Sequence, residues 1–144
     1  MTYVLDTKKF KRYTFPTHIN DVVLDRSDAV SSEIFAGEIE QEKAPPLHIH
    51  QNTEQIFSIL EGEGILEIGQ NDSLTHRTEN VVPGNIVRIP PNIYQNIHGL
   101  GKNTLRYLAI DCFIRGKPNN QPTRVPHVKT LCKEQGWNYS KVKK

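Results

Sequence analysis

From Ser31 onward the chain is a succession of short runs of β-forming residues separated by turn residues. Successive side chains in a strand point to opposite faces, so a run with apolar residues at every second position predicts a strand with one buried face. We expect such strands at 32–40, 54–62, 63–68, 85–90, 93–98 and 104–113. Short strands separated by turn signals predict an all-β sandwich or barrel.

The two ends of the chain are less regular than this middle part, which divides the sequence into three regions. Residues 1–32 predict an N-terminal arm, residues 33–113 the barrel, and residues 114–144 a C-terminal arm. Within the first arm, the apolar positions predict short edge strands at 13–15 and 22–24. Exposed strand edges are commonly covered by a second copy of the chain, so we expect a homodimer.

In the C-terminal arm, a short helix is expected from Pro126 to Gln135, because proline is favoured at the first helical position and Gly136 is a stop signal. The lysine-rich end of the chain is expected to be frayed, and His127 to be a surface or capping residue. Within the barrel, the polar stretch 69–80 has no period and predicts a loop with His76 exposed.

The stretch from residue 45 to residue 62 carries the most chemistry. His48 and His50 are two residues apart in an extended segment, so their rings share a face and can meet one ligand. After a polar turn, a second run brings either Gln55 or Glu54 beside them. Neutral imidazoles with an oxygen donor are common metal ligands. The alternative is a pair of hydrogen-bonded histidines on a half-buried strand.

Two longer patterns resemble the motifs of the cupin superfamily. Residues 46–62 resemble the first motif, which reads His-x-His, three or four residues, Glu or occasionally Gln, and a hydrophobic strand ending in Gly. Residues 83–96 resemble the second motif, which reads Gly, five residues, Pro-x-Gly, two residues and His. The resemblance implies an antiparallel jelly-roll barrel with a short C-terminal helix. It also implies a divalent metal, such as zinc, iron, nickel or manganese, and a small organic substrate.

The chain departs from the second motif at two positions. Gln95 stands where the family carries its histidine, and Asn92 replaces the glycine of Pro-x-Gly. The ligand set implied by the resemblance is therefore His48, His50, Gln55 and Gln95. Neutral amide oxygens are poorer donors than carboxylate or imidazole, so this set would hold a divalent metal less tightly than three histidines and a glutamate.

Two alternatives to this set are open. A slip of one residue would turn Glu54 inward in place of Gln55 and give two histidines and one carboxylate, the pattern of open non-haem iron sites. His98 lies three residues beyond Gln95 and would need a bulge in the strand to replace it.

The last long strand adds two polar residues to the candidate site. Leu105, Tyr107, Ala109 and Asp111 share one face of this strand. If that face lines the cavity, Tyr107 and Asp111, together with Glu54, are candidates for substrate contact or proton transfer. The alternative places Asp111 in solvent at the strand end and turns the hydroxyl of Tyr107 outward.

Composition and charge narrow the function classes. Eighteen basic and 16 acidic residues give a net charge of +2, and this scattered charge argues against nucleic-acid binding. No apolar run approaches the length needed to cross a membrane. Cys112 and Cys132 lack Cys-x-x-Cys spacing and no secretory leader is visible, so we expect a cytoplasmic protein with free thiols.

Two functions from different classes remain open. The first is a metal-dependent cupin enzyme that acts on a small organic substrate with dioxygenase-, isomerase- or cyclase-like chemistry. The second is a non-catalytic cupin that binds or senses a small molecule, without requiring a metal. The replacement of the family's last histidine by Gln95 is the main support for the second function.

Overall fold

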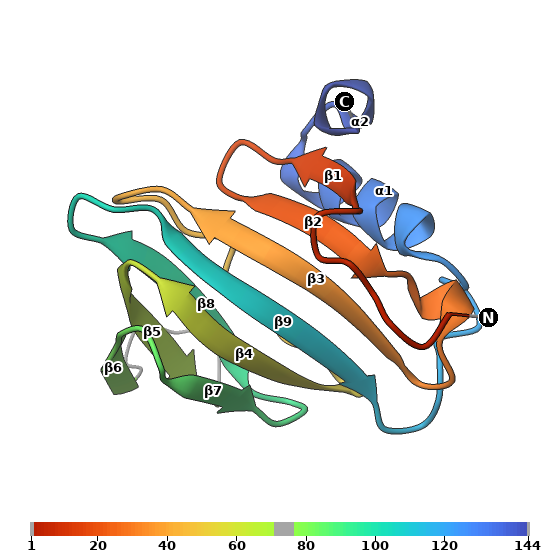
Figure 1. Cartoon of the computed structure of the whole chain (residues 1–144), viewed down its shortest axis with the longest axis horizontal. Coiled ribbons are helices and arrows are strands. Elements are labelled where there is room, and N and C mark those ends of the chain that lie inside the picture. Colours follow the sequence, from red (N-terminus) through yellow and green to blue (C-terminus); the bar gives the residue numbers. More distant parts are fainter. Residues whose placement is uncertain (1, 71–76, 144) are drawn as a thin grey trace.

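The structure is a computed structural model that describes residues 2–70 and 77–143. It consists of two antiparallel sheets and two C-terminal helices (Figure 1). The larger sheet has the strand order β1-β2-β3-β9-β4-β7, with bounds Lys11–Thr14, Ile19–Leu24, Ser32–Ile39, Leu105–Phe113, Thr53–Glu61 and Ile86–Ile89. The smaller sheet has the order β6-β5-β8, with bounds Arg77–Val81, Glu63–Gly69 and Tyr94–Leu100. This confirms the expected antiparallel jelly roll with a C-terminal helix.

The two sheets lie one behind the other in Figure 1, with the larger sheet in front. In the described part of the chain no ladder between named strands joins them, so the jelly roll consists of two facing sheets and not of one closed sheet. Helix α1 (Arg124–Gln135) lies behind β1 and β2, and α2 (Tyr139–Val142) follows it. A 3-10 helix, η1 (Arg26–Asp28), links β2 to β3.

Cross-strand rows on the inner face of the larger sheet explain where the core ends and a polar region begins. The pairing of β3, β9 and β4 aligns Phe35, Ala109 and Phe57 in one apolar row. The row nearer the end of the sheet consists of Glu33, Asp111 and Gln55, all of which are buried. The alternation of side chains thus places three polar groups side by side inside the molecule.

Glycine at position 37 makes room for an aromatic ring in the next row. Gly37 pairs with Tyr107, and a Cβ atom added to Gly37 would overlap the phenol ring. The ring of Tyr107 also packs on Phe57, with ring centroids 5.0 Å apart. Tyr107 therefore lies flat against the inner face of the sheet, and the expectation that its side chain could be directed outward is wrong.

The structure corrects several expected elements. The end of the predicted loop 69–80 forms strand β6, which pairs with β5, whereas His76 lies outside the described residues. Helix α1 begins two residues before Pro126 and ends at Gly136, which has a left-handed φ of 73°. The predicted frayed end contains α2, whose Val142 is buried in the core. None of the described helices has the length and apolar character needed to span a membrane.

Candidate functional site

A cavity of about 520 Å³ lies against the polar row of the larger sheet. Its wall includes Gln55 and Asp111 from the larger sheet and Gln95 from the smaller sheet. Helix α1 closes another side with Arg124 and His127. This volume falls in the range of pockets that hold small organic ligands.

His48 and His50 reach this cavity from the segment between β3 and β4, which is a loop and not the expected strand. Pro45 and Pro46 lack backbone N–H groups, which prevents a continuous ladder here. Main-chain bonds nevertheless hold the loop, because His48 N donates to Gln95 O at 3.2 Å and Gln95 N donates to His48 O at 2.9 Å. The two imidazole rings lie edge to face with centroids 4.9 Å apart.

Asn92 binds, at His50, the loop between β3 and β4, residues 40–52, here called the histidine loop. Its backbone N–H donates to His50 O at 2.8 Å, and its φ of 65° lies in the left-handed region. Asparagine tolerates that conformation better than most residues other than glycine. The replacement of the motif's glycine by Asn92 therefore preserves the turn that positions His50.

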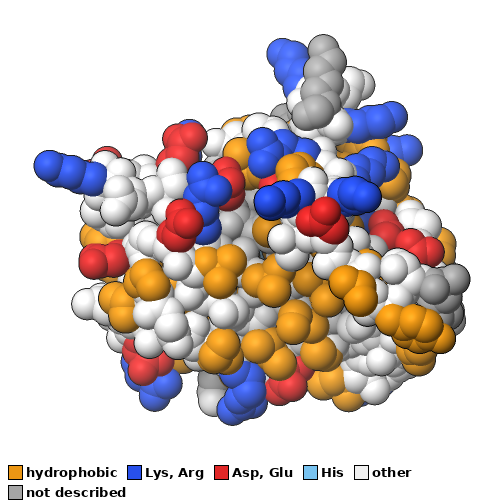
Figure 2. Space-filling model, viewed as in Figure 1, with side chains coloured by type: hydrophobic (Ala, Val, Ile, Leu, Met, Phe, Trp, Pro, Cys, Tyr) orange, Lys and Arg blue, Asp and Glu red, His pale blue; other side chains and the backbone are white. Residues whose placement is uncertain are grey.

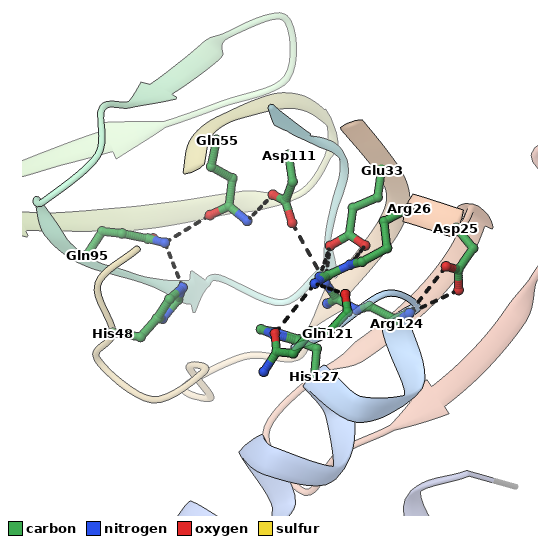
Figure 3. A network of polar contacts seen from close by, with 10 residues as sticks. All are labelled: Asp25, Arg26, Glu33, His48, Gln55, Gln95, Asp111, Gln121, Arg124 and His127. Atoms are coloured by element: carbon green, nitrogen blue, oxygen red, sulfur yellow. Dashed lines mark hydrogen bonds and ion pairs between the residues drawn. The ribbon is translucent and has the colours of Figure 1, made fainter. Parts of the chain in front are cut away.

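A directed chain of hydrogen bonds joins His48 to Asp111 across the cavity wall (Figure 3). His48 Nδ1 lies 2.7 Å from Pro46 O and must donate to it, because a carbonyl oxygen only accepts. The lone pair on Nε2 then accepts the amide N–H of Gln95 at 2.7 Å. The same amide nitrogen donates to Gln55 Oε1 at 3.0 Å, and Gln55 Nε2 donates to Asp111 Oδ1 at 2.7 Å.

Four histidines line the cavity, and burial keeps their imidazoles neutral. Burial and the neighbouring charge of Arg124 are among the causes that lower the pKa of His18 and His50 to about 3. Burial also lowers the pKa of His48 and, more strongly, that of His127. His127, expected to be a surface or capping residue, is half-buried and lines the cavity, where its Nδ1 lies 3.2 Å from Gln121 Oε1. Among the residues that the structure describes, the buried Nε2 of His50 has no hydrogen-bond partner.

A buried charge cluster lies beyond Asp111 (Figure 3). Arg26 makes a two-bond contact with Glu33, with distances of 2.8 and 2.7 Å. Arg124 donates from Nη1 to Glu33 Oε1 at 2.5 Å and lies 3.7 Å from Asp111 Oδ2. The cluster thus joins η1, β3, β9 and α1 at one end of the cavity.

The two carboxyl groups in this cluster have opposite pKa shifts. Burial alone raises the pKa of Glu33, but the charges of Arg124 and Arg26 outweigh it and lower the value to about 2. Burial and the adjacent charge of Glu33 raise the pKa of Asp111 to about 7. Two acids whose surroundings separate their pKa values are a recurrent feature of acid–base sites.

The remaining candidate site residues from the sequence lie partly on the cavity side and partly on the outer side of the two sheets. Gln55 faces the cavity, which settles the choice left open by the sequence, whereas Glu54 lies on the outer face beside Arg88, with a contact of 3.4 Å. A cavity role for Glu54 is therefore withdrawn. His98 also faces outward and contacts Glu67 at 3.0 Å, so it does not replace Gln95. Tyr107 lines the cavity, and burial raises the pKa of its hydroxyl.

Sequence reasoning missed several residues of the site, namely His18, Arg26, Glu33 and Arg124. The position of Glu33 could have been predicted, because it lies an even number of residues from Phe35 and Ile39 and therefore on the same, buried face of β3. The other three lie outside regular alternation, so their positions depend on long-range packing that no local pattern encodes.

The donor atoms do not fit a tightly held divalent metal in this arrangement. No group of three or more histidine, cysteine, aspartate or glutamate side chains suited to a metal occurs within residues 2–70 and 77–143. Among the four expected ligands, the Nε2 atom of His48 and the oxygen of Gln55 already accept hydrogen bonds from Gln95. Only two of the four expected ligands are imidazoles, and the other two are amides, which are weaker donors than the ligands usual in such sites.

Comparisons with solved structures identify the fold. A predicted oxalate decarboxylase from Thermotoga maritima has a TM-score of 0.64 at 14% identity, covering 76% of this chain and 98% of that chain. Ectoine synthase from P. lautus has a TM-score of 0.64 at 14% identity, covering 77% and 78%. KdgF from Halomonas sp. has a TM-score of 0.60 at 12% identity, covering 77% and 94%. No family model and no curated protein sequence matches the chain.

These neighbours are cupin, or double-stranded β-helix, proteins, and the chain has their fold. At this level of identity the likeness concerns the fold alone, and the activity must be argued from the site.

Proposed function

We propose that the protein binds a small organic molecule in this cavity and transfers a proton at Asp111. The observation that carries the proposal is the position of Asp111, a buried carboxyl in the cavity wall that accepts from Gln55 and is linked through Gln95 to His48. A pKa of about 7 allows such a group to give or take a proton near neutral pH. The chemistry is of the isomerase or cyclase type, without an assigned substrate.

The contacts assign a separate role to each residue around the bound molecule. The hydrogen bond from Gln55 fixes the carboxyl of Asp111, and Glu33 and Arg124 set its proton affinity. Tyr107 stays protonated because its pKa is raised, so its hydroxyl can donate to a bound molecule. Phe57 and Ile97 supply apolar wall that excludes water from the ligand.

The test begins with a small-molecule screen by thermal shift on the wild-type protein. Each hit is then incubated in D₂O, and NMR follows the exchange of its carbon-bound protons. We expect exchange with wild-type protein and at least a roughly hundredfold slower exchange with Asp111→Asn, since general acid–base catalysis typically contributes that much. An Asp28→Asn variant, altered at an exposed site, serves as the control. Hits that bind without exchange would identify a binding module instead.

The metal-dependent enzyme expected from the sequence is the second candidate. It is favoured by the proximity of His48 to His50 and by the unpartnered Nε2 of His50. It would require the Gln95 amide to turn away from His48. Elemental mass spectrometry of untagged protein, beside a His48→Ala/His50→Ala double variant, distinguishes the candidates. Near-stoichiometric metal in wild type only would replace the first proposal by this one.

A further inference from the structure

The buried charge cluster uses its two arginines differently. Arg26 is fully engaged, because its Nε and Nη2 contact Glu33 and its Nη1 lies 3.3 Å from Gln121 O. Arg124 shares an oxygen of the same Glu33 through Nη1 and is too far from Asp111 Oδ2, at 3.7 Å, for a hydrogen bond. Within residues 2–70 and 77–143, Glu33 is therefore the only carboxylate that accepts a hydrogen bond from either guanidinium group, whereas Asp25 accepts from the backbone N–H of Arg124.

Arg124 also keeps a donor without an acceptor. Its Nη2 lies 3.1 Å from the side-chain amide of Asn20, whose oxygen accepts when the amide is turned toward it. Its Nε is buried and has no partner within the described structure. Only 4% of Arg124 is exposed, so bulk water does not replace the missing acceptor. A buried, unsatisfied donor on a cation is costly, and an anion that reached Nε after a small turn of the Arg124 side chain, which lines the cavity, would remove that cost.

The rest of the cavity wall supplies no further negative charge near Arg124. The four lining histidines are neutral, and the charge of Arg124 is among the causes that lower each of their pKa values. The other lining carboxylate, Glu134, is exposed on α1.

The remaining lining describes the body of the ligand. Apolar wall comes from Pro45, Leu47 and Ile49 on the histidine loop and from Phe57, Ile97 and Leu131. His50 Nε2 is a second polar atom without a partner, on the loop that faces α1. A molecule with one charged end and a compact apolar part would match both halves of this wall.

We propose that the ligand is a small organic anion whose carboxylate, or a group of like charge, is bound by Arg124 while its apolar body lies against the histidine loop. This inference rests on the proposed small-molecule function and names the class of molecule. A guanidinium group suits a carboxylate because its fork of N–H donors matches the two oxygens.

Matched probes separate charge from shape. Benzoate, benzamide and benzylamine share a ring and differ in charge, and propionate, propionamide and propylamine form a smaller set. We expect benzoate or propionate to raise the Tm and to bind in calorimetry at least about tenfold more tightly than its amide, consistent with one charge-assisted hydrogen bond. The amines are expected to give no shift.

Two variants assign the effect to the cavity. Arg124→Gln should abolish the preference for the carboxylate, and Arg124→Lys, which keeps the charge, should retain it with weaker binding. The lysine variant keeps the test informative if the glutamine variant does not fold. Arg88→Gln, on the outer face, is the matched control and should bind like wild type.

The outcomes separate this inference from the function on which it rests. Amides or amines that bind as tightly as the carboxylates would overturn the anion and leave the small-molecule function intact. Carboxylate binding that is unchanged in both Arg124 variants would also overturn it. If no probe of any charge binds and the wider screen yields no hit, both proposals fail.

Discussion

At the scale of single residues, Gln95 determines what the two histidines can do. Its amide nitrogen donates both to His48 and to Gln55, so it fills the position at which a third imidazole would complete a metal site. The replacement makes the site a hydrogen-bonded chain. A cupin framework can therefore keep its histidines and lose their partner.

The first prediction concerns this residue. Gln95→His should create a site with three imidazoles and raise the affinity for Zn²⁺ at least about a hundredfold, because imidazole is a far better zinc ligand than an amide. Calorimetry with Zn²⁺ measures the change. The control is the double variant Gln95→His/His50→Ala, which should lose the gain. Equal zinc binding by the wild type and Gln95→His would show that the geometry does not support a metal.

At the scale of elements, the start of α1 is fixed beside the cavity by the side chain of Asp25, which lies between β2 and η1. Asp25 precedes η1, and its carboxylate accepts the backbone N–H of Arg124, with both oxygens at 3.2 Å. The N-cap residue of α1, Thr123, makes no side-chain cap bond, so Asp25 supplies the acceptor in its place. This contact satisfies one of the unpaired N–H groups of the helix end.

The second prediction follows from this contact. Asp25→Ala should lower the free energy of unfolding by about 1–2 kcal/mol, the usual cost of removing a helix-capping acceptor, because its carboxylate accepts the N–H of Arg124 in α1 and also that of Ser27 in η1. Urea denaturation measures the change. Asp28→Ala, at an exposed position of η1, is the control and should stay within about 0.5 kcal/mol of wild type. Equal destabilisation by both variants would assign the effect to η1 and not to α1.

Much of this element level could be predicted from the sequence, and the reasons for success and failure are local. Alternation gave which residues share a face of β4 and of β9, because this depends only on positions within one strand, but it left open whether Gln55 or Glu54 points inward and whether Asp111 lines the cavity. It could not show that the histidine segment is a loop, since that depends on Pro45 and Pro46 and on contacts with Gln95 and Asn92. Arg124 reaches Asp25 across 99 positions of sequence, a contact without a local signature.

At the scale of the whole molecule, the buried titratable groups determine how stability depends on pH. The folded pKa of His18 and His50 is about 3, below the ordinary value of 6.5, so the unfolded chain binds these protons first on acidification. Asp111 acts in the opposite direction, because its folded pKa of about 7 lies above its ordinary value of 3.8. Burial lowers the pKa of His48 and His127 as well, so four histidines oppose one carboxyl with a raised pKa, and acidification destabilises the fold.

The third prediction is that the free energy of unfolding decreases as the pH falls from about 6.5 to about 4, by roughly 1 kcal/mol per pH unit for one net proton. Denaturation at a series of pH values measures the slope. Asp111→Asn should make it steeper, because the opposing group is removed. A flat profile in wild type would mean that the histidines are not held neutral.

The outer face of the larger sheet is a second feature at this scale. Figure 2 shows apolar side chains gathered over it. Register aligns Ile34, Ile110 and Ile56 in one row, and Ile86 on the neighbouring strand is 64% exposed. The row continues into Arg88 on β7, which pairs with Glu54 at 3.4 Å, and Arg106 pairs with Glu38 farther along the face, so these charges beside the apolar residues are paired. Such a face suits a second copy of the chain better than a charged partner.

The fourth prediction is therefore that the expected homodimer forms through this face and not through the strand edges. Light scattering after size exclusion should give a dimer for wild type and a monomer for Ile110→Lys, because the lysine would bury a charge between the sheets. Thr78→Lys, at an exposed position of the smaller sheet, should remain dimeric. A dimer that survives Ile110→Lys would exclude this interface.

His48 and Gln95 meet twice, once through their main chains and once through their side chains. The main-chain pair holds the histidine loop to β8 whatever side chain stands at position 95. Architecture and chemistry are therefore carried by different atoms of the same two residues. A change of the side chain at position 95 would therefore leave the main-chain pair, and with it the position of His48 beside the cavity, in place.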